Sequence, residues 1–262
     1  MQKIGSFFRN TDGFGDELKA RFQALGATMS AAREPAVSPV AGSLTSHRRS
    51  DWLVMELEPL KQIRRETEAT LNDVVLAVVT GAFRYFFEGR GADPDATPLK
   101  TSVPVNVRAD DDRSLGNKIS NWMFNLPVHE PDPVRRLHRV GELTRELKES
   151  NQALGTHLMM QFAEFAPTSL LSLAARASDG AVDTFVTNVP GPQFPLYMFG
   201  AKMIHMLPQV PLIAGMGIAV GLMSYNGTIC WGVTSDAEVV PDIEDFTAAI
   251  ETSFTDLIEA TE

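Results

Sequence analysis

The sequence predicts an α/β (α+β) fold in which a mixed sheet is flanked by helices. Three observations support this prediction. Stretches of alternating polarity, such as DWLVMELE at 51–58, are interspersed with stretches whose apolar residues recur at helical spacing. Asn226-Gly227 lies between two apolar stretches and is a strong hairpin signal. The 262 residues are 44% hydrophobic and 21% charged, a globular composition. Strands that alternate with helices favour a layered sheet.

The N-terminal region is expected to hold one helix and a linker. The helix is indicated by apolar residues three and four apart, at Phe14, Leu18, Phe22 and Leu25. Residues 34–43 are rich in Pro, Ser and Gly, which indicates a linker. We therefore divide the chain into residues 1–38, a helix with a linker, and residues 39–262, a folded lobe.

The first half of the lobe is expected to alternate between strands and helices. The strand at 51–58 is followed by a charged helix at 60–69, which Pro59 opens because proline suits a first helical turn. A strongly apolar helix follows at 70–87. Strands are predicted at 99–108 and 119–128, with a loop at 109–114 that contains three consecutive aspartates.

The second half begins with helices and ends mostly as strands. Asp132-Pro133 starts a long amphipathic helix, and a Met- and Phe-rich helical region covers about 154–177. Strands are predicted at 183–192, 201–211, 217–227 and 228–236. Pro241-Asp242 then opens the C-terminal amphipathic helix.

The apolar helix at 70–87 begins with two polar residues that need an explanation. Thr70 and Asp73 resemble a capping box with Asp in place of Glu. Negative charge in the first turn is favoured by the helix dipole, so Asp73 has a structural explanation. Asn72 has none, because the helix is apolar on nearly every face. We expect Asn72 to find partners from another segment.

Composition excludes several classes of function. The net charge is −10 and the pI about 5.0, so a nucleic-acid partner is not expected. Cys230 is the single cysteine, which excludes an intramolecular disulfide and suits a reducing compartment. No two of the five histidines have metal-ligand spacing. The apolar stretch at 210–223 is shorter than the roughly 20 residues that span a bilayer, and we interpret it as buried strand.

Three other features could suggest chemistry, but each has a simpler interpretation. The glycines at 215–221 lie within an apolar strand rather than in a dinucleotide fingerprint, and can mark close backbone approach. His47 and Asp51 could be a base and its orienting carboxylate, but they flank two arginines beside the linker, which favours a hydrated boundary. Cys230 lies between Ile229 and Trp231, which favours an inert buried thiol.

Several motifs together resemble one family. NVPGP at 188–192 follows an apolar strand and predicts a rigid turn, and on local grounds a plain strand-terminating turn is the favoured interpretation. With LNDVVLA at 71–77, SVPVNVR at 102–108, Gly116-Asn117, SYNG at 224–227 and VPD at 240–242, it resembles the C-terminal half of the bacterial wax ester synthase/acyl-CoA:diacylglycerol acyltransferase family. The resemblance covers about 39–254, and the motifs occur in the family's order.

The resemblance implies one lobe of a chloramphenicol-acetyltransferase-like fold, which has two lobes and an active-site tunnel between them. It places Asn72 and Asp73 near the active-site region, at the start of a helix by the lobe interface, where both would brace the tunnel wall. It also implies structural or tunnel-lining positions of unknown role: Pro104, Arg108, Gly116, Asn117, Asn188, Pro190, Gly191 and Pro192. The family's general base is a histidine of a His-His-x-x-x-Asp-Gly motif in its N-terminal lobe, and these 262 residues do not contain that motif.

The expected function is therefore that of a C-terminal acyltransferase lobe at 39–262 that is inactive alone. The family transfers a fatty acyl group from acyl-CoA to a long-chain alcohol or diacylglycerol, so acyl-CoA is a substrate and no cofactor or metal is expected. The partner would be an N-terminal lobe, or a second copy through self-association. The alternative is a non-catalytic acyl-chain-binding or interaction module derived from such a lobe. A cytoplasmic location is expected, with peripheral contact at a membrane or lipid-droplet surface.

Overall fold

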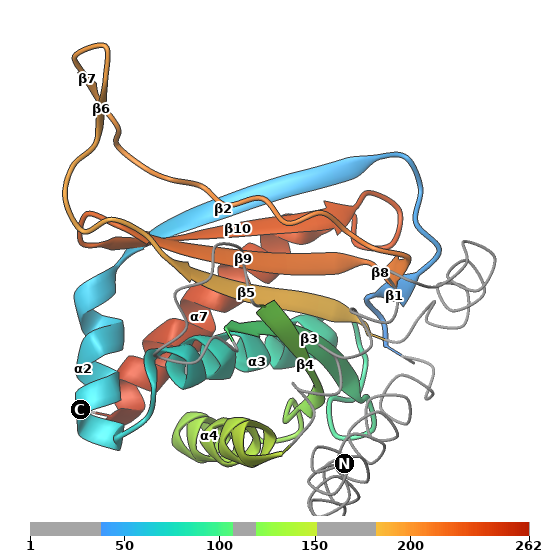
Figure 1. Ribbon diagram of the computed structural model, residues 1–262. Helices are drawn as coiled ribbons and strands as arrows, with labels where there is room; N and C mark the ends of the chain where they lie inside the picture. The colour runs from blue at the N-terminus through green and yellow to red at the C-terminus, as the bar shows by residue number, and fades with distance from the viewer. Residues whose placement is uncertain (1–37, 107–118, 151–181, 262) are drawn as a thin grey trace, which may run out of the picture.

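The computed structural model describes residues 38–106, 119–150 and 182–261 (Figure 1). The helices among them are α2 (Leu57–Thr67), α3 (Leu71–Gly89), α4 (Pro133–Glu149) and α7 (Ile243–Thr261). The longer strands are β2 (Arg48–Glu56), β3 (Leu99–Asn106), β4 (Ile119–Leu126), β5 (Thr184–Pro190), β9 (Ile218–Tyr225) and β10 (Thr228–Asp236). The predicted helices at 1–30 and 154–177 and the loop at 109–114 lie outside the described residues.

A six-stranded mixed sheet forms the centre of the fold, in the order β2-β10-β9-β5-β3-β4. β5 pairs in parallel with β9 and with β3, and the other pairs are antiparallel. The contact between β3 and β5 covers just two residue pairs, Thr101 with Thr184 and Ser102 with Phe185. β5 then continues along β9 to Pro190, so the sheet opens between β3 and β5. The predicted mixed α/β architecture is confirmed.

The helices gather on one face of this sheet and form the main core with it (Figure 1). α3 is buried along most of its length, as its apolar sequence predicts. It packs against α7 through Phe83 and Phe246, whose ring centroids lie 4.6 Å apart. Phe86 adds an edge-on contact with the same ring at 5.5 Å. The first turn of α3 therefore lies at one end of a helix that is fixed by its apolar contacts.

The opposite face of the sheet is crossed by an irregular segment around Pro208. Gly221 of β9 and Gly232 of β10 are direct cross-strand partners and turn the same way, away from the helices. An added Cβ at Gly232 would overlap the carbonyl oxygen of Pro208, and one at Gly221 would lie 2.8 Å from Val210 Cγ2. The two glycines thus admit the backbone of the crossing segment, as expected for glycine within strands.

This crossing segment corrects the predicted strand at 201–211. Only β7 (Ala201–Lys202) is strand there, paired with β6 (Tyr197–Met198) in a short projecting hairpin. Pro208 and Val210 lie against the sheet face, and residues 203–211 join no ladder, because Pro208 and Pro211 have no N–H to donate. His205, which the prediction placed in a strand, is exposed in this irregular part.

Three further elements differ little from their predicted form. The apolar stretch at 210–223 is strand only from β8 (Gly215–Met216) onward, and β8 pairs with β1 (Ala41–Gly42). The hairpin at Asn226-Gly227 is confirmed, with φ angles of 45° and 86°. α2 begins at Leu57, so Pro59 is its third residue, still within the first turn.

Among the described residues, no single helix is both long enough and apolar enough to cross a membrane. α2 and α3 together meet the length and composition expected of a span, but they are bent by 107° where they meet.

Candidate active-site region

A hollow of about 820 Å³ brings together three of the predicted site residues, Asn72, Asp73 and Pro104. Its walls come from the turn between α2 and α3, the first turn of α3, β3, β4 and α4. The other lining residues are Thr67, Glu68, Ala69, Thr70, Val105, Trp122, Leu137, His138, Gly141, Thr144, Arg145 and Lys148. The volume lies within the range of small-molecule sites.

Asp73 closes the predicted capping box and also ties α3 to α4. Its Oδ2 accepts hydrogen bonds from the backbone N–H of Thr70 at 2.9 Å and from Thr70 Oγ1 at 2.6 Å. The N–H of Asp73 donates to Thr70 Oγ1 at 3.1 Å, which completes the box. Thr144 Oγ1 of α4 donates to the other oxygen, Oδ1, at 2.7 Å. Asp73 is 5% exposed and its carboxylate accepts three hydrogen bonds, so it serves as a structural tie.

Asn72 differs from Asp73 in its hydrogen bonding. It is half-buried, lines the hollow, and makes no side-chain hydrogen bond to any described residue. Partners from another segment, which the sequence led us to expect, are therefore not found in the described part of the chain. The amide offers both donors and an acceptor to whatever enters the hollow.

The NVPGP motif lies elsewhere, where β5 ends beside the hairpin of β9 and β10. Gly191 N–H donates to Ser224 Oγ at 3.2 Å, and Asn226 N–H donates to the carbonyl oxygen of Pro192 at 3.0 Å. A Cβ at Gly191 would overlap the Ser224 carbonyl. Asn188 is half-buried and Pro190 exposed on β5. These contacts fix the end of β5 to the turn between β9 and β10. Arg108, Gly116 and Asn117 lie outside the described residues.

Of the histidines in the described residues, His138 lines the hollow and the others do not. His129 lines a separate hollow, and His47 and His205 are exposed. His47 has no pairing with Asp51, whose Oδ1 accepts from the N–H of Trp52 at 2.9 Å. Sequence reasoning singled out neither His138 nor its neighbours on α4. Their spacing along a predicted helix was the signal that could have identified them.

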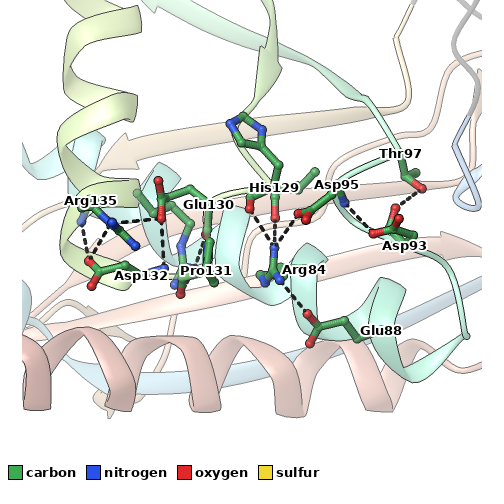
Figure 2. A network of polar contacts seen from close by, with 12 residues as sticks. Arg84, Glu88, Asp93, Asp95, Thr97, His129, Glu130, Pro131, Asp132 and Arg135 are labelled. Atoms are coloured by element: carbon green, nitrogen blue, oxygen red, sulfur yellow. Dashed lines mark hydrogen bonds and ion pairs between the residues drawn. The ribbon is translucent and has the colours of Figure 1, made fainter.

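A network of polar contacts fixes the start of α4 against α3 (Figure 2). The buried Glu130 contacts Arg135 at 3.2 Å and Arg139 at 3.0 Å. Burial alone raises the pKa of Glu130, but the N–H of Asp132 and these guanidinium groups outweigh it and hold the pKa below its usual value. Arg84 of α3 donates to the carbonyl oxygens of Val128 and His129, both at 3.0 Å. The walls of the hollow are thus rigidly connected.

Comparison with solved structures defines the fold first. The wax ester synthase/diacylglycerol acyltransferase from Marinobacter aquaeolei VT8 aligns with a TM-score of 0.66 at 23% identity, over 91% of this chain and 56% of that chain. The epimerization domain of tyrocidine synthetase B aligns with a TM-score of 0.57 at 11% identity, over the same shares. The fold is therefore one lobe of the chloramphenicol-acetyltransferase-like architecture, as predicted.

Sequence comparison then gives the family. Residues 115–258 match the model of the WS/DGAT C-terminal domain, and the chain belongs to that family. The protein named "Probable diacylglycerol O-acyltransferase tgs1" of Mycobacterium tuberculosis is 31% identical over 229 residues, which are 86% of this chain and 50% of that protein. The O-acyltransferase WSD of Acinetobacter baylyi is 26% identical over 211 residues, 79% of this chain and 46% of that protein. The chain spans about half the length of the curated relatives it matches.

Proposed function

We propose that this chain is the C-terminal lobe of an enzyme that transfers a fatty acyl group from acyl-CoA to a long-chain alcohol or to diacylglycerol. The observation that carries the proposal is the convergence of Asn72, Asp73 and Pro104 on one hollow. The family match and the names of the relatives support the same chemistry. Acyl-CoA serves as a substrate, and the reaction uses no cofactor or metal.

Direct attack of a hydroxyl on a thioester requires a general base within hydrogen-bonding reach of that hydroxyl. We assign this base to a histidine of an N-terminal lobe, because the His-His-x-x-x-Asp-Gly motif does not occur in the 262 residues. Within the hollow, Asp73 is committed to the capping box and to Thr144 and does not orient a histidine. The C-terminal lobe supplies a wall and substrate contacts.

An exposed apolar arm supports the need for a partner. Strands β6 and β7 form a hairpin that projects from the body of the molecule (Figure 1). Tyr197 is 63% exposed and Met198 68% exposed, and Phe199 at the tip is fully exposed. A cluster of large apolar side chains in water favours association. We assign this arm to the contact with an N-terminal lobe, and to self-association when that lobe is missing.

The substrates also set the location that we propose. Long-chain alcohols and diacylglycerol reside in membranes and lipid droplets, so the assembled enzyme would work peripherally at such a surface from the cytoplasmic side. No basic amphipathic helix is evident in the sequence, so contact with the surface would follow from the substrate rather than from an electrostatic anchor.

The test is acyl transfer from palmitoyl-CoA to hexadecanol and to dipalmitoylglycerol. We expect no turnover by the purified chain alone, and turnover after the N-terminal half of a relative is added, because the general base arrives with that half. Light scattering before and after the addition is the control, since the added half should replace self-association through the arm.

Two other outcomes would contradict this proposal. Turnover by the chain alone would mean that a base is present in it, and His138 would then be the first candidate, ahead of His47. A well-folded chain that stays silent after the addition would favour the non-catalytic acyl-binding module.

Replacing Asn72 with alanine tests the bracing role in the same assay. We expect kcat of the assembled enzyme to fall about tenfold or more, because one amide contact with a reacting or neighbouring group is worth roughly 1.5 kcal/mol. The unfolding midpoint should not change, since Asn72 makes no hydrogen bond to a described residue. Unchanged turnover with Asn72→Ala would remove Asn72 from the active-site region.

A further inference from the structure

The two sides of helix α4 carry different charges. His138, Gly141, Arg145 and Lys148 are three, four and three residues apart, which places them on one face, and all four line the hollow beside Asn72. Arg139, Glu142 and Glu146 instead line a separate hollow with His129. Glu142 and Glu146 are therefore turned away from the candidate active-site region, together with Arg139, whereas Arg145 and Lys148 are turned toward it.

The two cations nearest the C-terminal end of α4 have no acidic partner among the described residues. Arg145 and Lys148 form no ion pair with any described residue, whereas Arg135 and Arg139 of the same helix both contact Glu130. The chain has 33 acidic and 23 basic residues, so acidic partners are abundant. Two cations on the wall of a hollow, with no ion pair in the described part of the chain, can receive an anion.

A second hollow adjoins the first and adds more positive charge. It is lined by Lys61, Arg64 and Arg65 of α2, and it shares Glu68 and Ala69 with the first hollow. Arg64 has no ion pair in the described structure, while Lys61 and Arg65 both contact Glu58.

Positive charge predominates over the two hollows together. The lysines and arginines are Lys61, Arg64, Arg65, Arg145 and Lys148. Against them stand the lining carboxylates of Glu68 and Asp73 and that of Glu58, which contacts Lys61 and Arg65. The Asp73 carboxylate already accepts three hydrogen bonds. The net charge around the first turn of α3 is thus opposite in sign to the net charge of the whole chain, which is −10.

We infer that these adjoining hollows bind the phosphate groups of the acyl-CoA donor, with Arg145 and Lys148 as the principal contacts. The inference rests on the proposed function, which supplies a donor with several phosphates at one end and a thioester at the other. Arginine offers a planar fork of donors and lysine a compact charge, and both suit phosphate oxygens. Lipid headgroups share the phosphate ester chemistry, so the experiment separates the two sources.

The test is direct binding to the whole chain, measured by titration calorimetry with CoA and with pantetheine, which lacks phosphates. We expect CoA to bind, and the double variant Arg145→Gln/Lys148→Gln to weaken CoA binding about tenfold or more, since hydrogen bonds to charged groups are the stronger ones. Pantetheine should bind more weakly than CoA and be unaffected by the double variant. Higher salt should weaken CoA binding to the unsubstituted chain.

A matched control removes the same two charges elsewhere. Arg49→Gln/Lys202→Gln replaces one arginine and one lysine that are exposed on β2 and β7, away from both hollows. CoA affinity should be unchanged in this control, because the effect depends on position rather than on net charge. Equal losses in the two double variants would overturn the inference.

Binding to vesicles of phosphatidylglycerol and of phosphatidylcholine is measured as a second experiment. Binding to phosphatidylglycerol that needs Arg145 and Lys148, without binding of CoA, would overturn the inference in favour of a lipid headgroup. Absence of CoA binding by the folded chain would overturn it as well. The binding experiment can be separated from the activity assay. If CoA affinity depends on the two cations but no acyl transfer follows addition of the N-terminal half, the proposed function is contradicted. The phosphate site is then still supported.

Discussion

Replacing Gly232 with alanine is expected to destabilise the lobe by about 3 kcal/mol, near the upper end of the range for overpacking. The new methyl group would overlap the carbonyl oxygen of Pro208, which belongs to the backbone and cannot turn aside as a flexible side chain can. The crossing segment would have to lift from the sheet. That movement would also disturb Val210, which is buried in a small apolar cluster with Met216 and Ala219 on this face.

Urea unfolding of the purified chain measures this effect, with Gly89→Ala as the matched control. Gly89 is the last residue of α3, and no atom lies within 4 Å of an added Cβ there. Alanine at this site should be neutral or slightly stabilising, because it lowers the entropy of the unfolded chain. A Gly232→Ala variant as stable as Gly89→Ala would contradict the close packing of Pro208 on the sheet.

Replacing Asp183 with asparagine is expected to stabilise the lobe above pH 6. Asp183 is 1% exposed, and burial raises its pKa to about 6, although the N–H of Lys100 donates to its Oδ2 at 2.6 Å. Its Oδ1 has no hydrogen-bond partner among the described residues. Asparagine can still accept from Lys100 N–H and carries no charge to be desolvated.

The direction of the pH dependence follows from the raised pKa. In the unfolded chain the carboxyl ionises near pH 3.9, whereas in the folded lobe it ionises at about 6, so stability falls as the pH rises through this window. The full difference corresponds to roughly 3 kcal/mol. Unfolding free energies at pH 5 and 7.5 should therefore show a decrease for the natural chain that is missing in Asp183→Asn.

Asp236 provides a control, because its pKa is shifted in the opposite direction. It is also buried, and burial alone raises its pKa, but the N–H groups of Glu238, Thr45 and Val239 outweigh this and hold the pKa below its ordinary value. Its contribution to stability is present above about pH 3.9 and is lost only in stronger acid. Asp236→Asn should therefore destabilise the lobe equally at pH 5 and 7.5. Similar pH profiles for the two variants would contradict the assignment for Asp183.

Local patterns in the sequence predicted the elements whose causes are local. The capping box of Thr70 and Asp73 and the turn at Asn226-Gly227 were both identified from a few adjacent residues, because their hydrogen bonds and φ angles involve those residues alone. The buried helix α3 followed from the length of its apolar run. The resemblance to one acyltransferase family also came from ordered short motifs, and the family match agrees with it.

Features that depend on distant residues were missed or misread. The predicted strand at 201–211 failed because its apolar side chains fit a strand, while its backbone instead packs on two glycines in strands that follow it in the chain. The role of Thr144 could not be read from its own neighbourhood, because it completes the hydrogen bonding of Asp73, which lies 71 residues earlier.

The order of residues was therefore enough to establish the fold class, the helix and hairpin signals and the family. Folding was needed to show that Asn72, Asp73 and Pro104 share a hollow with the cations of α4, and that the NVPGP motif lies apart from them. The physical reason is that capping and turn formation are settled by neighbouring residues, whereas a binding surface is assembled when apolar faces distant in the chain are buried against each other.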